Sequence, residues 1–164
     1  MSEFYFIYDS FLGRVFVYSD GRNITKVDLK VKSRRNALIK RPCELEVFAR
    51  VKEWLDIYFG GGYPDFKLPV QAEGTEFSKN VWRIISNIPY GHILTYGEIA
   101  DMISSGSGNR MSARAVGAAC GRNPVPVLIP CHRVLGRGNR LTGYSSGLDI
   151  KIKLLELEKT EFVL

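Results

Sequence analysis

The sequence of 164 residues contains few residues of the kinds that form disulfides or bind metal ions. Its three cysteines, Cys43, Cys120 and Cys131, are odd in number and widely spaced, which argues against a disulfide framework and favours a reducing compartment. There is no Cys-x-x-Cys motif, and His92 and His132 are the two histidines. We therefore predict neither a metal site nor a cofactor.

The sequence also lacks an apolar run of membrane-spanning length. Its first residues include Glu3 and Asp9 and show neither a basic leader segment nor a small-residue cleavage site. We expect a cytoplasmic protein that does not contact a membrane. The net charge of +6 is compatible with a polyanionic partner but does not establish one. With 45% hydrophobic residues, the chain can bury a core in one domain or in two small ones.

The residues before position 70 predict a small antiparallel sheet. β-branched and aromatic residues dominate three segments that are typical of strands, Phe4–Tyr8, Val15–Tyr18 and Ile24–Val31. Asp20 and Gly21, between the second and third segments, are typical of a hairpin turn.

A basic segment and a helix follow this sheet. We interpret Lys30–Arg41 as a solvated edge or loop in preference to a binding patch. Helical spacing then brings five apolar residues to one face, namely Val47, Val51, Trp54, Leu55 and Tyr58. Three consecutive glycines at 60–62 end the pattern.

The second half of the chain is predicted to be mostly helical. Thr75 precedes an amphipathic helix, which Pro89 and Gly91 bring to an end. Thr95 and Glu98 have the spacing of a capping box, which starts a further helix at Tyr96.

Two helices around a turn suggest a helix-turn-helix. Ser112 caps a second helix that extends to Arg122 and carries small residues along one side. The predicted turn, Ser104–Met111, is longer than the usual connection of about 3–4 residues. Taken alone, small residues on a helix more often indicate close helix packing than DNA recognition.

The segment Val125–Pro130 reads Val-Pro-Val-Leu-Ile-Pro and directly precedes Cys131 and His132. We expect it to be buried and extended. Cys131 is either a nucleophile or a packed structural thiol, because a free thiol also behaves as a small hydrophobic group. Neighbouring side chains do not face one another, so His132 would act as a base through a bridging water.

A histidine that acts in this way needs an acidic partner on its other ring nitrogen. A predicted helix at Leu148–Lys159 and the residues after it offer four candidates, namely Asp149, Glu156, Glu158 and Glu161. Spacing does not choose among them.

Several motifs in this order resemble the O6-alkylguanine-DNA alkyltransferases, also called methylated-DNA–protein-cysteine methyltransferases. They are "TYGEIA", "ARAVGAA", "NPVPVLIPCHRV", "GYSSGL" and "KLLELE", and the resemblance covers residues 75–159. It implies an α+β protein with two domains. Residues 1–72 would form a small antiparallel sheet with a helix, and residues 75–164 a mostly helical domain with a helix-turn-helix.

The resemblance implies repair of DNA by irreversible alkyl transfer, once per molecule, from O6-alkylguanine or O4-alkylthymine to Cys131. His132 would be the water-mediated base and Glu158 its orienting carboxylate. Tyr96 would donate a proton to the departing guanine and help to rotate the phosphate. Asn123 would be the hinge between the second helix and the active-site segment.

The implied partner is double-stranded DNA, bound by a monomer in the minor groove with the alkylguanine flipped out. Arg114 would fill the space left in the base stack. The small residues Ala115, Gly117 and Ala118 would allow the helix to approach the groove closely. The remaining residues assigned to DNA or the base are Arg122, Val134, Tyr144 and Ser145.

The zinc site of some relatives has no counterpart here, because Cys43 has no accompanying cysteine and histidine set. Cys120 is interpreted as a helix-packing residue near the pocket. Two other classes of protein are rivals. A cysteine hydrolase would use Cys131 with oxyanion donors, and a noncatalytic DNA-binding module would have no use for the Pro-Cys-His-Arg sequence.

Overall fold

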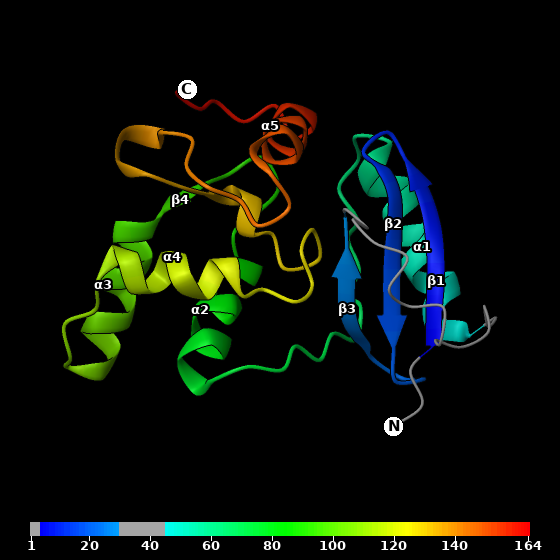
Figure 1. The fold of residues 1–164 in the computed structure, drawn as a ribbon, viewed down its shortest axis with the longest axis horizontal. Helices are drawn as coiled ribbons and strands as arrows, with labels where there is room; N and C mark the ends of the chain where they lie inside the picture. Colours follow the sequence, from blue (N-terminus) through cyan, green and yellow to red (C-terminus); the bar gives the residue numbers. More distant parts are fainter. Residues whose placement is uncertain (1–3, 30–44) are drawn as a thin grey trace. The chain divides into compact units, whose positions relative to one another are not determined.

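A computed structural model describes residues 4–29 and 45–164, which form two compact units (Figure 1). The first consists of Met1–Glu73 with Pro124–Pro126, and the second of Gly74–Asn123 with Val127–Leu164. An antiparallel sheet with a helix and a mostly helical C-terminal part confirm the predicted α+β class.

The sheet of the first unit contains three antiparallel strands, β1 (Phe4–Ser10), β2 (Gly13–Ser19) and β3 (Ile24–Asp28), in that order. The predicted strands are therefore confirmed, with β3 ending at Asp28. Leu29 follows the strand as a buried bend, and the last two residues of the predicted third strand, the basic segment at 30–41 and Cys43 lie outside the described residues.

The β2–β3 connection is a turn of four residues stabilised by Asp20. The Asp20 carboxylate accepts hydrogen bonds from the backbone nitrogens of Arg22 and Asn23 at 2.8 and 2.7 Å. Gly21 has φ +106°, a conformation that glycine adopts without a steric penalty. The turn prediction is confirmed, although the loop is longer than a two-residue hairpin.

Helix α1 (Glu46–Phe59) packs against the strands through aromatic residues. The Phe48 ring stacks on Phe6 at 5.8 Å between ring centroids, and Phe59 stacks on Tyr8 at 5.7 Å. The helix buries four of the five predicted apolar residues, while Trp54 is half-buried. Gly60 caps its end as expected.

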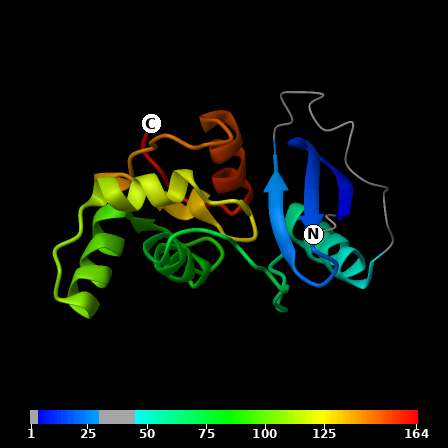
Figure 2. The same ribbon diagram turned by 60° about the horizontal axis from the view of Figure 1, so that its bottom comes forward.

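The second unit is built from helices and two very short strands (Figure 2). In chain order its elements are α2 (Glu76–Ser86), β4 (Leu94–Thr95), α3 (Tyr96–Ser107), α4 (Ala113–Gly121), the 3-10 turn Cys131–Arg133, β5 (Val134–Leu135), the 3-10 turn Arg137–Asn139 and α5 (Leu148–Leu157). Strands β4 and β5 pair in parallel.

The caps of α3 and α4 form as predicted. The Thr95 hydroxyl accepts a hydrogen bond from the Glu98 backbone nitrogen, and the Glu98 carboxylate accepts one from the Thr95 nitrogen, which completes the capping box. The Ser112 hydroxyl accepts from the Ala115 nitrogen at 3.2 Å. Helices α3 and α4 pack on each other and form the helix-turn-helix.

The structure corrects two predicted helix boundaries. Helix α3 continues to Ser107 and ends at Gly108, whose φ is 70°, so the turn Gly108–Ser112 is shorter than expected. The helix therefore includes Gly106. Glycine inside a helix costs about 1 kcal/mol, which capping and packing can outweigh. Helix α5 ends at Leu157, so Glu158 lies at its C-cap and Lys159 adopts φ 55°.

The segment Val125–Pro130 is buried but not extended, so that part of the prediction is wrong. Pro124, Pro126 and Pro130 lack the N–H groups that a strand needs for its ladder. Val127 adopts φ 74°, which reverses the chain. Cys131 then begins a 3-10 turn instead of ending a strand.

Candidate active site

A cavity of about 800 Å³ in the second unit brings together residues from three segments. The start of α3 supplies Tyr96, helix α4 supplies Arg114 and Cys120, and the segment 136–145 supplies Tyr144 and Ser145. Cys131 also lines this cavity, although it is 3% exposed. The cavity therefore gives a ligand access to a thiol that is otherwise buried.

The Cys131 thiol is in its neutral form at rest. Burial raises its pKa, while hydrogen bonds with Asn123 and Tyr144 and the nearby charge of Lys151 lower it to a smaller extent. The Asn123 Nδ2 group donates to the Cys131 Sγ atom at 3.0 Å and to the Ile129 carbonyl oxygen at 2.8 Å. Asn123 lies two residues after the end of α4, so its side chain connects the end of this helix to the Cys131 thiol.

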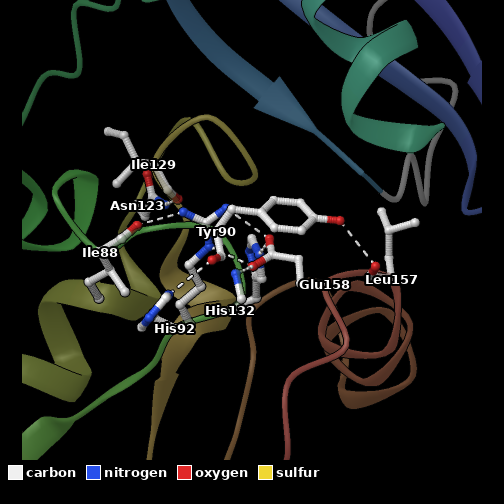
Figure 3. A network of polar contacts seen from close by, with 10 residues as sticks. Ile88, Tyr90, His92, Asn123, Ile129, His132, Leu157 and Glu158 are labelled. Atoms are coloured by element: carbon white, nitrogen blue, oxygen red, sulfur yellow. Dashed lines mark hydrogen bonds and ion pairs between the residues drawn. The ribbon is translucent and has the colours of Figure 1, made fainter. Parts of the chain in front are cut away.

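His132 and Glu158 form a buried pair (Figure 3). The His132 Nε2 atom lies 2.8 Å from the Glu158 Oε1 atom. The other three acidic candidates, Asp149, Glu156 and Glu161, are exposed. Of the four acidic candidates, Glu158 is therefore the one that contacts His132.

Glu158 is also held by Arg133, a residue that the sequence reasoning did not assign. The Arg133 Nε and Nη2 groups donate to the two carboxylate oxygens at 2.8 and 2.9 Å, and the Gly91 nitrogen donates at 3.1 Å. Burial raises the pKa of Glu158, but the hydrogen bonds and charges of His132 and Arg133 outweigh this effect and hold the pKa well below its usual range. The carboxylate is ionised.

His132 is neutral in this environment. Burial lowers its pKa, and the hydrogen bond and charge of Glu158 oppose that shift without reversing it. Because an ionised carboxylate can only accept hydrogen bonds, we infer that Nε2 carries the proton and Nδ1 is the basic nitrogen.

Tyr96 occupies the first position of α3, on the cavity wall. Its hydroxyl oxygen accepts a hydrogen bond from Thr142 Oγ1 at 3.2 Å, which leaves its own proton available for donation. Burial raises the pKa of Tyr96, so the phenol stays protonated. Gly117 of α4 lies against the Tyr96 ring, since a Cβ at position 117 would be 3.8 Å from it.

The predicted DNA-binding residues of α4 have different environments. Arg114 and Ala118 are exposed, while Ala115 and Gly117 are half-buried. Arg122 is exposed, and its guanidinium donates to the Ser78 hydroxyl at 3.3 Å.

Val134 does not fit its predicted contact with the base or DNA. Val134 belongs to β5, which pairs with β4 inside the unit. The exposed fraction of Val134 is 0%, so its side chain cannot reach DNA in this structure. Its carbonyl oxygen instead accepts a hydrogen bond from Lys151 Nζ at 2.7 Å.

Lys151 is a further site residue that the sequence reasoning missed. Its side chain is fully buried, and its ammonium lies 5.9 Å from the Tyr96 ring centroid and 6.0 Å from that of Tyr144. Burial lowers the pKa of Lys151 to about 8, so the group is mostly protonated at neutral pH. A signal was present, because Lys151 shares helical spacing with Leu154, Leu155 and Glu158.

Cys120 also lines the cavity, which confirms its expected place near the pocket. Burial raises the pKa of Cys120 to about 12, so this second thiol remains neutral and poorly nucleophilic. Among residues 4–29 and 45–164, no group of three or more cysteine, histidine or acidic side chains could hold a metal ion. None of the helices in these ranges is both long and apolar enough to cross a membrane.

Family models match both parts of the chain. Residues 76–160 match the model of the 6-O-methylguanine DNA methyltransferase, DNA binding domain. Residues 4–72 match the model of the 6-O-methylguanine DNA methyltransferase, ribonuclease-like domain.

Individual proteins are similar over nearly their whole length. The methylated-DNA–protein-cysteine methyltransferase of Haemophilus influenzae is 40% identical over 162 residues, covering 98% of this chain and 88% of the relative. That of Methanosarcina acetivorans is 41% identical over 156 residues, covering 94% and 97%. The structure of Mycobacterium tuberculosis OGT in complex with DNA has a TM-score of 0.82 at 36% identity, covering 95% of this chain and 92% of the other.

Proposed function

Because the chain belongs to the 6-O-methylguanine DNA methyltransferase family, we propose that it repairs DNA by moving an alkyl group from O6 of guanine to Cys131. The observation that carries this proposal is the position of Cys131, which lines a cavity. The next residue, His132, forms a buried pair with the Glu158 carboxylate. O4-alkylthymine is a second substrate that we expect from the same chemistry.

The reaction requires that the neutral Cys131 thiol lose its proton. His132 accepts it on Nδ1 through a bridging water, since its Nε2 atom is held by Glu158. The ionised Glu158 stabilises the imidazolium that forms. Asn123 and Lys151 stabilise the thiolate, because each already lowers the pKa of Cys131 against the effect of burial.

The thiolate sulfur then attacks the alkyl carbon, and a new S–C bond forms as the C–O6 bond breaks. The electron pair of the broken bond goes to the guanine, which takes up a proton from Tyr96. The proton held on His132 restores Tyr96 by way of solvent, so protons and charge balance. A thioether is a poor leaving group, and we expect each molecule to react once.

The DNA partner is a duplex approached through its minor groove. Arg114, exposed at the cavity, enters the base stack when the alkylated nucleotide flips out. Flipping costs a few kcal/mol and is easiest at a weakened pair such as alkylguanine, which favours the lesion. Small exposed residues such as Ala118 allow a close approach to the groove.

We further propose that residues 75–164 form the domain that carries this chemistry and that residues 1–72 form a separate domain. The protein acts as a monomer, because one chain supplies all of the proposed catalytic residues. A cytoplasmic location is supported by the cysteine content, which suits a reducing compartment.

The test is incubation with duplex DNA that carries a radiolabelled methyl group on O6 of guanine. We expect label to appear on the protein in a 1:1 ratio and to be absent from the Cys131→Ala variant. That variant should still bind DNA, because affinity comes from backbone contacts and not from the thiol.

The rival functions give different outcomes. Continuous turnover of an acyl ester, without label on the protein, would indicate a cysteine hydrolase. DNA binding with neither label transfer nor ester hydrolysis would indicate a noncatalytic binding module.

A further inference from the structure

The cavity walls separate charges of opposite sign. The acidic residues on the walls, Glu98 and Asp101, belong to α3. The basic residues are Arg114 on α4 and Arg137, which follows β5. A flipped nucleotide remains attached to the DNA backbone, so its phosphates must stay at the mouth of the cavity, where they would avoid the α3 side and be attracted to the two arginines.

Arg137 is available for an external ligand. It is exposed, and within the described parts of the chain its side chain forms no hydrogen bond or ion pair. Arg133, four positions earlier, differs completely, since its guanidinium is used by Glu158 and by the Ile88 carbonyl oxygen at 2.7 Å. Two arginines close in sequence thus have separate roles, one internal and one directed outward.

The backbone around Arg137 is held in place. Leu135 pairs with Thr95, and the Gly136 nitrogen donates to the Arg140 carbonyl oxygen at 2.8 Å. A Cβ at Gly136 would lie 2.9 Å from Thr142 Cγ2 and 3.2 Å from the Arg140 carbonyl oxygen, so residues 140–142 pack closely against this glycine. Gly138 adopts φ 68°, which completes the turn. A fixed backbone reduces the entropy lost when Arg137 binds a ligand.

We propose that Arg137 is a second DNA-binding arginine, which holds a backbone phosphate next to the flipped nucleotide from the 136–145 wall of the cavity. The proposal rests on the function proposed above and adds a residue to it. A guanidinium suits this role because it is always charged and presents planar donors that match phosphate oxygens. Arg114 acts in the base stack, whereas Arg137 acts on the backbone.

The test compares Arg137→Ala with Arg140→Ala in binding to an O6-methylguanine duplex over a series of salt concentrations. Both arginines are exposed and lie on the same loop. Arg137 lines the cavity, whereas Arg140 is not among the residues that line it. We expect Arg137→Ala to weaken binding about tenfold and to lower the slope of log K against log salt by about 1. Arg140→Ala should change both quantities much less, and Arg137→Lys should keep the slope.

Reaction with free O6-benzylguanine provides the second readout, because this substrate has no phosphate. Arg137→Ala should react with it at the wild-type rate. An equal loss on the free base and on DNA would overturn the proposal, since Arg137 would then act on the pocket itself. An unchanged salt slope, or an equal effect of Arg140→Ala, would also overturn it. If the wild-type protein reacts with neither substrate, the proposed function itself fails.

Discussion

The Asn123 side chain joins the end of the helix-turn-helix to the reactive thiol, with its Nδ2 atom 2.8 Å from the Ile129 carbonyl oxygen and 3.0 Å from Cys131 Sγ. One amide group therefore fixes the chain reversal at Val127 and polarises the sulfur. A movement of α4 on DNA would reach Cys131 through this contact.

We expect Asn123→Ala to lower the free energy of unfolding by about 1 kcal/mol, because the buried Ile129 carbonyl loses one of its two donors and keeps the Cys131 backbone nitrogen at 2.8 Å. Transfer should also slow, since one of the two hydrogen bonds that lower the pKa of Cys131 is lost. Urea unfolding and single-turnover label transfer measure the two effects. A wild-type transfer rate in this variant would show that the contact is structural alone.

Glu158→Gln should slow single-turnover transfer by about tenfold or more, because the neutral amide no longer stabilises a charged His132. The variant should also be less stable by about 3 kcal/mol, since Arg133 is left as a buried cation without its counterion. Glu156→Gln is the matched control, because Glu156 lies two positions earlier, on the exposed side of α5. Equal rates for the two variants would assign the orienting role to another group.

Local sequence rules predicted much of this site. The Thr95–Glu98 box and the Ser112 cap depend on residues three positions apart, so the starts of α3 and α4 could be predicted without tertiary information. These two starts place Tyr96 and Arg114. The Pro-Cys-His-Arg setting marked Cys131 as a candidate nucleophile, and the resemblance assigned it as the alkyl acceptor and selected Glu158.

The buried cations were not predicted, because their positions depend on contacts between distant segments. Arg133 meets Glu158 across 25 residues, and Lys151 meets the Val134 carbonyl across 17. Both residue types are usually exposed, so sequence reasoning assigns them to the surface. The Val127 reversal was missed for a related reason, since a β-branched residue rarely adopts positive φ.

Lys151 gives a prediction about pH. Its pKa in the folded protein is about 8, below the ordinary value of 10.5, so between these values the unfolded chain binds more protons than the folded one. The contribution of Lys151 to the free energy of unfolding should therefore rise as pH increases through this window. Urea unfolding of wild type and of Lys151→Met at pH 7 and pH 10 measures this contribution as the difference between the two free energies of unfolding.

Burial raises the pKa of Cys131 and raises that of Cys120 to about 12, which opposes ionisation of both thiols in the folded state. Ionisation of the cysteines in the unfolded chain is common to the two proteins and cancels in the difference. We expect the stability of wild type relative to Lys151→Met to increase with pH. A constant difference would mean that the ammonium is better solvated than its burial implies.

Alkylation of Cys131 should lower the stability of the protein. The methyl group replaces the thiol hydrogen, which removes a donor from the hydrogen bonds around Sγ, and it crowds a sulfur that is already 3.0 Å from Asn123 Nδ2. Overpacking costs about 1–3 kcal/mol, and about 1 kcal/mol lowers the melting temperature by roughly 2–4 °C in a chain of this size. Thermal melts before and after complete reaction with an O6-methylguanine duplex, with the DNA removed, should therefore differ by several degrees, and a benzyl donor should widen the gap. Cys131→Ala carried through the same treatment should show no shift. If the alkylated protein melts at or above the unreacted one with both donors, the cavity of about 800 Å³ accepts the alkyl group without displacing Asn123, and the expected crowding at Sγ does not occur.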